Sequence, residues 1–202
     1  PWCSRPRLRR ALIPWNEAVE REGIRTSPFA NCPRHVCFIS EFMRMEHCKA
    51  GLNFSSSEVL YGGVSTDRFY TRRTASDFEN RQLRFLYAGY VEPNRGLHTI
   101  IEALGLLPEN LRGRVELSIA QTDPPITGEY VKEIKTRIEQ LGLSKTVSFL
   151  GKIRHDEMPR VYRTHHVLIS ASTRPEGLPM TMMEAMCAGC AVITTGSGGA
   201  IE

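Results

Sequence analysis

The sequence has few cysteines and no long apolar run. Six cysteines among 202 residues form no repeating framework, which argues against a disulfide scaffold and favours a reducing, cytoplasmic setting. No apolar run reaches the ~20 residues that span a bilayer, and no apolar leader core is visible near the start. We therefore expect a cytoplasmic protein. The cysteines are Cys3, Cys32, Cys37, Cys48, Cys187 and Cys190.

The sequence also has only a small excess of positive over negative charge. The formal net charge of +4 is far from that of a nucleic-acid-binding tail, so we expect no nucleic-acid partner. Part of the excess is local, at Arg5, Arg7, Arg9 and Arg10. A solvated basic segment is the simpler interpretation. Peripheral contact with an anionic membrane surface is the alternative.

The chain does have an ordinary globular composition, 41% hydrophobic and 24% charged, enough for one substantial core and part of another. From residue 83 onward, short apolar runs alternate with amphipathic stretches, which predicts a doubly wound, Rossmann-like α/β domain with a parallel sheet covered on both faces. We expect strands at 84–88, 115–119, 147–150, 167–169 and 191–194, and helices at 97–107, 131–141, 156–162 and from Pro179.

The first 82 residues are less regular. A short helix is predicted over Ala11–Glu22, and His35–Ile39 is typical of a buried strand. Ser40 can cap a helix that runs to about Ala50. A second strand is expected over Glu58–Tyr61. A glycine-bearing loop over 62–69 and a polar connector over 71–82 follow it.

Two glutamates, eight positions apart, flank the start of the helix expected from Pro179. Glu176 precedes the helix, and Glu184 lies roughly 7–8 Å along its axis. The free N–H groups and the dipole of a helix start favour an anion between the two carboxylates. Glu184 stands in an apolar run and needs a partner, which a ribose diol would supply. The segment predicts a sugar-nucleotide site; two solvated glutamates are the plainer alternative.

A second signal is the strand–glycine–loop–helix unit around Gly89 and Arg95. Gly89 permits close backbone approach after a strand, and Arg95 could reach a phosphate. Gly89, Gly151 and the Glu176 loop all follow strand ends, so they are expected to meet on the rim where ligands of such sheets bind.

No metal site is expected. The pair Cys187–Cys190 has CxxC spacing but lies at the back end of a helix, so two small core residues are the preferred interpretation. His155, His165 and His166 have no second ligand at a recognisable spacing.

Together these segments resemble the retaining, nucleotide-sugar-dependent glycosyltransferases of group 1 (family 4), which have the GT-B fold. The motif that carries the resemblance is Glu176-Gly-Leu-Pro-x-x-x-x-Glu184-Ala-Met, then Ala188-Gly189-x-Ala191-Val192-Ile193 and Gly198-Gly199-x-x-Glu202. Phe38-Ile39-Ser40-Glu41, Gly63-Val64-x-x-Asp67-Arg68-Phe69, Leu86-Tyr87-Ala88-Gly89 and Val147-x-Phe149-Leu150-Gly151 precede it in the family's order.

The resemblance implies a donor-binding half of a larger enzyme. Residues 1–62 would be the remnant of an N-terminal acceptor domain, 63–82 the interdomain connector, and 83–202 a nucleotide-sugar-binding domain that is incomplete at its C-terminal end. The donor would be a UDP-sugar or GDP-sugar and the acceptor is unknown. Transfer would retain the anomeric configuration and would need no metal or cofactor.

The resemblance also assigns roles to residues. Glu184 would bind the ribose hydroxyls, and Glu176 would be the catalytic residue facing the donor sugar. Arg95 stands where the family usually has a phosphate-binding Lys, and Tyr90 where it tends to have an Arg. Either Lys152 or Arg154 replaces that missing charge, or donor binding is weak. The remaining donor-binding residues would be Gly89, Ile153, Gly177, Leu178, Pro179 and Met180.

Two alternatives stay open. One is a non-catalytic nucleotide-sugar-binding module whose activity needs a partner chain. The other is an unrelated Rossmann-like nucleotide protein such as an epimerase, which the lack of a GxGxxG fingerprint disfavours.

Overall fold

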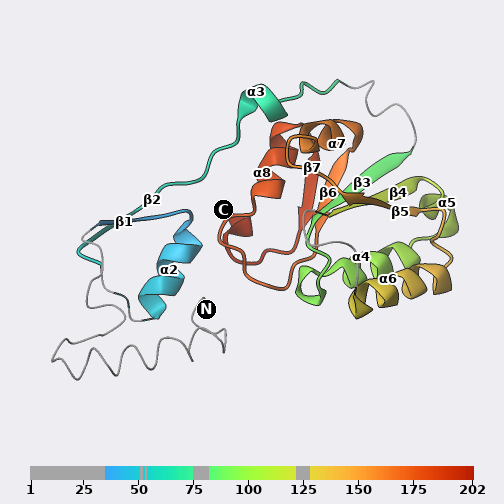
Figure 1. Ribbon diagram of the computed structural model, residues 1–202, viewed down its shortest axis with the longest axis horizontal. Helices are drawn as coiled ribbons and strands as arrows, with labels where there is room; N and C mark the ends of the chain where they lie inside the picture. The colour runs from blue at the N-terminus through green and yellow to red at the C-terminus, as the bar shows by residue number, and fades with distance from the viewer. Residues whose placement is uncertain (1–34, 51, 53, 75–81, 122–127) are drawn as a thin grey trace.

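The computed structural model describes residues 35–50, 52, 54–74, 82–121 and 128–202, and Figure 1 shows their arrangement. The basic cluster at Arg5–Arg10, the helix expected over Ala11–Glu22, and two cysteines, Cys3 and Cys32, lie outside the described residues.

Five parallel strands form the main sheet, in the order β5-β4-β3-β6-β7. The doubly wound sheet predicted from the sequence is therefore confirmed. The strand order reverses at β3: the chain adds β4 and β5 on one side of it and β6 and β7 on the other. At such a switch point, the loops that follow neighbouring strands run in opposite directions and open a crevice. The strands are β3 (Leu83–Gly89), β4 (Val115–Gln121), β5 (Val147–Lys152), β6 (Val167–Ser170) and β7 (Ala191–Thr194).

Helices cover both faces of this sheet (Figure 1). On one face lie α4 (Leu97–Gly105) and α6 (Glu129–Gln140), and on the other α7 (Met158–Thr164) and α8 (Met180–Cys187). Each face of the sheet has its own hydrophobic core, because successive side chains of a strand point to opposite faces. On β3, Tyr87 belongs to the core under α4 and α6, and Leu86 to the core under α7 and α8. A strand buried on both faces needs a continuous apolar run, which is the pattern read from its sequence.

A smaller parallel sheet precedes the main one. It pairs β1 (His35–Phe38) with β2 (Ser56–Val59), and α2 (Glu41–Lys49) connects the two strands. The buried side chain of Ser40 accepts a hydrogen bond from the Met43 N–H at 3.2 Å, as a helix cap should. The second strand lies two residues before the predicted Glu58–Tyr61, because the register of the pair is set by β1 and leaves Tyr61 beyond it.

Short elements were not predicted. The expected loop over 62–69 contains a helical turn, α3 (Thr66–Phe69), whose Phe69 is buried against Tyr162 with ring centroids 6.0 Å apart. Elements of three or four residues are too short to show a hydrophobic period. Besides α3 they are η3 (Pro93–Arg95), α5 (Glu109–Arg112) and η4 (Gly199–Ile201).

Helix α7 begins at Met158, two residues after the predicted start. None of the helices in the described ranges is long and apolar enough to cross a membrane. The domain boundaries at residues 62 and 82 stay predictions.

Candidate functional site

Two pockets adjoin at the carboxyl end of the main sheet. Pocket A, of about 170 Å³, lies between the end of β3 and the start of α8; pocket B, of about 360 Å³, lies between α3, α7 and α8. Both are lined by Met180 and Thr181, so they meet at the first turn of α8. Pocket A is also lined by Tyr87, Ala88, Gly89, Tyr90, Arg95, Ser170, Glu176, Leu178 and Pro179. Pocket B is also lined by Gly63, Val64, Ser65, Arg68, Phe69, His155, Met158, Tyr162 and Glu184.

An ion pair dominates the electrostatics of pocket A. Arg95 Nη1 lies 2.6 Å from Glu176 Oε1, and the two side chains are only 21% and 23% exposed. The guanidinium also stands over the Tyr90 ring, 5.8 Å from its centroid. Arg95 Nε is buried and has no hydrogen-bond partner among the described residues. The charge of Arg95, the residue predicted to bind a phosphate, is therefore balanced by Glu176, the residue predicted to face the sugar.

The loops that carry this pair are tied together by backbone contacts. The N–H groups of Thr173 and Arg174 donate to the Asn94 carbonyl at 3.0 and 3.4 Å, which joins the β3–α4 loop to the β6–α8 loop. Gly96 closes η3 with a left-handed φ of 70°, and a Cβ there would lie 1.9 Å from the Ala171 carbonyl oxygen. Only glycine combines this positive φ with the absence of a Cβ, and Gly96 therefore holds the backbone next to Arg95 in place.

Glu176 is held from the opposite side by the last glycines of the chain. Gly198 forms a parallel bridge with Glu176, and the Gly199 N–H donates to the Glu176 carbonyl at 2.7 Å. The φ of Gly198 is 67°, and a Cβ on it would lie 2.4 Å from the same carbonyl oxygen. The Gly198-Gly199 segment thus positions the backbone of the candidate catalytic residue.

Glu184 is the buried carboxylate of pocket B, with only 5% of its surface exposed. Its Oε2 accepts a hydrogen bond from the Tyr162 hydroxyl at 2.9 Å, and its Oε1 lies 2.8 Å from His155 Nε2. Burial, and then the neighbouring Glu184 charge, raise the pKa of Tyr162 well above its ordinary value, so this phenol stays a donor. The partner that a carboxylate in this apolar run requires is therefore present within the chain, in the form of Tyr162 and His155.

Nothing in the sequence pointed to these partners. His155 and Tyr162 lie 29 and 22 positions from Glu184 and carry no spacing signal. Packing of α7 against α8 brings them to the carboxylate. Packing of α3 against α8 places Arg68, also missed, in the lining of pocket B.

Most of the predicted donor-binding residues do line the pockets. Gly89, Arg95, Glu176, Leu178, Pro179 and Met180 line pocket A, and Glu184 lines pocket B.

Two predicted residues line neither pocket. Gly177 packs next to α2, where a Cβ on it would lie 3.0 Å from Met43 Cγ. Ile153 packs against the α7/α8 core, and its N–H donates to the Gln121 carbonyl at 3.0 Å. Their roles stay predictions.

The cations proposed to compensate for Tyr90 are placed elsewhere. Lys152 and Arg154 line neither pocket, and Arg154 pairs with Asp156 at 2.6 Å. Tyr90 itself lines pocket A, where its carbonyl accepts a hydrogen bond from the Tyr87 hydroxyl at 2.5 Å. Among the described residues, Arg95 is the cation of pocket A.

The sequence and the fold have counterparts in known proteins. Residues 71–202 match the family model of the group 1 glycosyl transferases. The chain is 27% identical over 183 residues to the GDP-mannose-dependent alpha-(1-6)-phosphatidylinositol monomannoside mannosyltransferase of Mycobacterium tuberculosis, covering 83% of this chain and 45% of the relative. It is 28% identical over 159 residues to the mannosylfructose-phosphate synthase of Agrobacterium fabrum, covering 74% and 34%.

Solved structures agree. HepE of Anabaena, in complex with UDP and glucose, matches with a TM-score of 0.69 and 26% identity, covering 83% of this chain and 46% of HepE. The chain spans less than half the length of these curated relatives and of HepE. The C-terminal domain of LpcC from Francisella tularensis matches with a TM-score of 0.57 and 26% identity, covering 68% of this chain and 72% of that domain. The match to the family model extends over most of the chain, which therefore belongs to the group 1 glycosyl transferases, as the Glu176–Glu184 segment predicted.

Proposed function

We propose that this chain is the donor-binding part of an enzyme that transfers a hexose from a UDP-sugar or GDP-sugar to an acceptor with retention of anomeric configuration. The observation that carries the proposal is the junction of pockets A and B at the start of α8. One pocket holds a cation and the other a buried carboxylate, and these are the groups that a diphosphate and a ribose require.

The diphosphate is assigned to the start of α8. Its N-cap residue Pro179 makes no side-chain capping bond, and the N–H groups of Met180 and Thr181 have no hydrogen-bond partner among the described residues. Such N–H groups and the helix dipole favour an anion. Arg95 lies beside them in pocket A and would exchange Glu176 for a phosphate oxygen.

The ribose is assigned to Glu184. Its two present partners differ in accessibility, because Tyr162 is fully buried and the His155 side chain is 63% exposed. A ribose hydroxyl would therefore replace His155 at Oε1, while Tyr162 keeps Oε2 occupied. This exchange keeps the buried carboxylate hydrogen-bonded throughout, as its burial demands.

The transfer step follows from the same charges. As the bond between sugar and diphosphate breaks, negative charge grows on the phosphate, and Arg95 with the α8 N–H groups stabilises it. Glu176, released from Arg95, would then face the sugar. No metal is needed for this charge stabilisation in the proposed mechanism.

The relatives support the donor class. The mycobacterial relative is named as GDP-mannose-dependent, and HepE was solved with UDP and glucose and with UDP-glucose. Their names describe lipid and small-molecule acceptors, so the acceptor here stays open among glycans, lipids and small molecules. A cytoplasmic location and contact with a membrane surface stay predictions.

Calorimetric titration with UDP and with GDP tests the assignment. We expect Glu184→Gln to weaken binding of the preferred nucleotide at least about tenfold, because a hydrogen bond between a charged group and the ribose is lost. We expect Glu176→Gln to leave nucleotide binding unchanged or tighter, because Arg95 is freed for the phosphate. Glu139→Gln, at an exposed position of α6, is the matched control. Intact binding by Glu184→Gln would refute the ribose assignment.

A non-catalytic module is the second candidate. It is favoured by the ion pair that engages Glu176, the candidate catalytic residue, with Arg95. Incubation with UDP-glucose and GDP-mannose separates the two readings: donor hydrolysis that Glu176→Gln abolishes supports the enzyme, and tight binding with no hydrolysis supports the module.

A further inference from the structure

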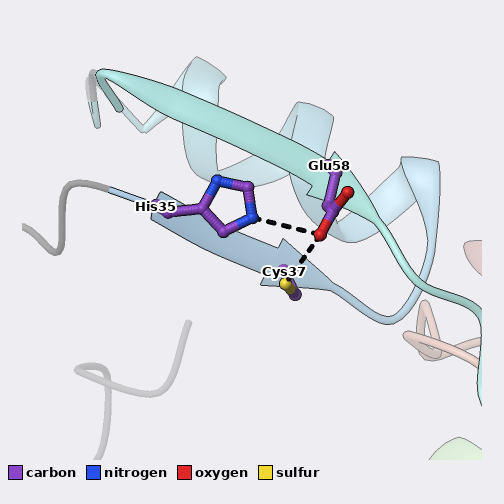
Figure 2. A group of neighbouring side chains, drawn as sticks. All are labelled: His35, Cys37 and Glu58. Carbon is purple, nitrogen blue, oxygen red and sulfur yellow. Dashed lines mark hydrogen bonds and ion pairs between the residues drawn. The ribbon is translucent and has the colours of Figure 1, made fainter.

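Three potential metal ligands meet on the small sheet, away from both pockets. His35, Cys37 and Glu58 are exposed, and their ligand atoms all lie within 4.8 Å of one another. Figure 2 shows the imidazole, the thiol and the carboxylate facing one another across β1 and β2. No metal site was expected from the sequence, in which Cys37 and Glu58 lie 21 positions apart and carry no recognisable ligand spacing.

Strand geometry brings the three side chains together. His35 and Cys37 are two residues apart on β1 and so share a face, and the parallel register pairs Cys37 with Glu58. The opposite face is the buried one: Phe38 contacts His47 of α2, with ring centroids 5.3 Å apart. The trio therefore stands on the exposed face of the two-stranded sheet.

The distances suit a tetrahedral zinc site. Glu58 Oε1 lies 3.1 Å from His35 Nε2 and 3.3 Å from Cys37 Sγ. With zinc–ligand bonds of about 2.0–2.3 Å, the edges of a tetrahedron measure roughly 3.3–3.8 Å. The remaining edge, from Nε2 to Sγ, is at most 4.8 Å and closes by a small side-chain rotation.

A fourth residue orients the imidazole. His35 Nδ1 is 3.0 Å from Ser56 Oγ, the residue paired with His35 in the register. A hydrogen bond at the second ring nitrogen is the usual support of a metal-ligating histidine, because it fixes the ring and leaves the other nitrogen for the ion.

We propose that His35 Nε2, Cys37 Sγ and Glu58 Oε1 bind one Zn²⁺, with water at the fourth position. Nitrogen, thiolate and carboxylate oxygen are the ligands that zinc accepts, and three protein ligands leave one position open. On binding, the Cys37 thiol releases its proton to solvent and the thiolate ligates the ion. The ion then cross-links β1 to β2. No trio residue lines pocket A or B, so the proposal is independent of the donor site.

Cobalt titration of the full 202-residue chain tests the site. Co²⁺ is a spectroscopic substitute for zinc, and thiolate ligation gives it an intense near-ultraviolet charge-transfer band. We expect one equivalent to bind with that band and to be displaced by Zn²⁺. Cys37→Ser should abolish the band, and His35→Ala and Glu58→Gln should each weaken Co²⁺ affinity at least about tenfold.

The chain provides matched controls. Cys48→Ser removes another exposed thiol, and Cys187→Ser tests the CxxC pair; both should keep the band. Ser56→Ala should keep the band and weaken affinity by about tenfold. Circular dichroism confirms that each variant is folded. The proposal is overturned if the wild-type chain shows no thiolate band, or if Cys37→Ser retains it.

Discussion

At the scale of single residues, two glutamates of one short segment occupy opposite environments. Glu184 is buried and is hydrogen-bonded to Tyr162 and His155, whereas Glu176 is paired with a cation in an open pocket. These environments support the two proposed roles: a buried carboxylate with one accessible, replaceable partner is suited to ribose, and one that balances Arg95 is suited to a site where phosphate arrives.

Tyr90 gives a prediction at this scale. Tyr90→Arg would add a second cation to pocket A, beside Arg95. We expect UDP or GDP to bind several-fold more tightly and with a steeper dependence on salt, because exposed charges are screened. Calorimetry at two ionic strengths measures both. Tyr90→Phe keeps the ring under the guanidinium and should change neither. Unchanged affinity in Tyr90→Arg would remove the missing charge as an explanation of weak donor binding.

A second residue prediction concerns Tyr162, the buried partner of Glu184. Tyr162→Phe leaves Glu184 Oε2 buried without its donor, so we expect the free energy of unfolding to fall by about 1.5–3 kcal/mol. Urea denaturation measures the change. Tyr70→Phe, at a tyrosine that is 65% exposed, should stay within about 0.5 kcal/mol of wild type. A loss no larger than that of the control would mean that Glu184 finds another partner.

At the scale of elements, the ends of α7 and α8 are held by one arginine from the connector. Arg73 donates to the carbonyls of Tyr162 and His165 at 2.9 and 2.6 Å, and to the carbonyl of Ala188 at 3.2 Å. Carbonyls at a helix end lack intrahelical partners, and a cation there also suits the dipole. The connector, expected only to be polar, therefore fixes the two helices that build pocket B.

Arg73→Ala tests this function. Three carbonyls lose a charged donor, and we expect the free energy of unfolding to fall by about 1–3 kcal/mol. Arg73→Lys should recover part of the loss, since a point charge cannot reach three carbonyls at once. Arg72→Ala, at the exposed neighbouring position, is the control and should be near neutral. Urea denaturation of the wild type and the three variants measures these changes. Equal midpoints for Arg73→Ala and Arg72→Ala would contradict the role of Arg73 in holding the two helix ends.

At the scale of the whole molecule, the small sheet and the main sheet are joined by a carboxylate. Glu202, after η4, accepts hydrogen bonds from the N–H groups of Glu41 and Phe42 at 2.8 and 2.7 Å. The Tyr61 hydroxyl donates to it as well, at 2.8 Å. Figure 1 shows the C-terminal end of the chain close to α2. A residue 160 positions downstream thus caps the helix that follows β1.

This contact predicts a dependence on pH. Desolvation alone would raise the pKa of Glu202, but the hydrogen bonds from Phe42, Glu41 and Tyr61 outweigh it and hold the pKa below its ordinary 4.5. A lowered carboxyl pKa stabilises the contact above pH 4.5, and this stabilisation is lost as the pH falls through the folded-state pKa. We expect the amide proton resonances of Glu41 and Phe42 to titrate in that acid range.

The matching variant is Glu202→Gln, which weakens the cap at neutral pH. Hydrogen exchange of the Glu41 and Phe42 amides should accelerate, while exchange in β3 and β4 stays the same. Glu46→Gln, on the same helix but paired with Lys49, should leave the Glu41 amide unaffected. If the Glu41 and Phe42 amides neither shift in the acid titration nor exchange faster in Glu202→Gln, the cap does not form in solution.

The sequence by itself determined the doubly wound sheet, the start of α8 and the segment from Glu176 to Glu184. These features are local: hydrophobic period, glycine and proline positions and helix-start chemistry act over a few residues. It also placed Gly89 and Arg95 on the correct rim, because parallel strands send their carboxyl ends to one edge.

Only the tertiary structure decided which groups meet. The pairing of Arg95 with Glu176, of Glu184 with Tyr162, and of Cys37 with Glu58 joins residues more than twenty positions apart. These contacts depend on strand register and on how α7 packs against α8, and neither leaves a periodic trace in the sequence. The chemistry of each residue was readable from its type, but its partner was set by the fold.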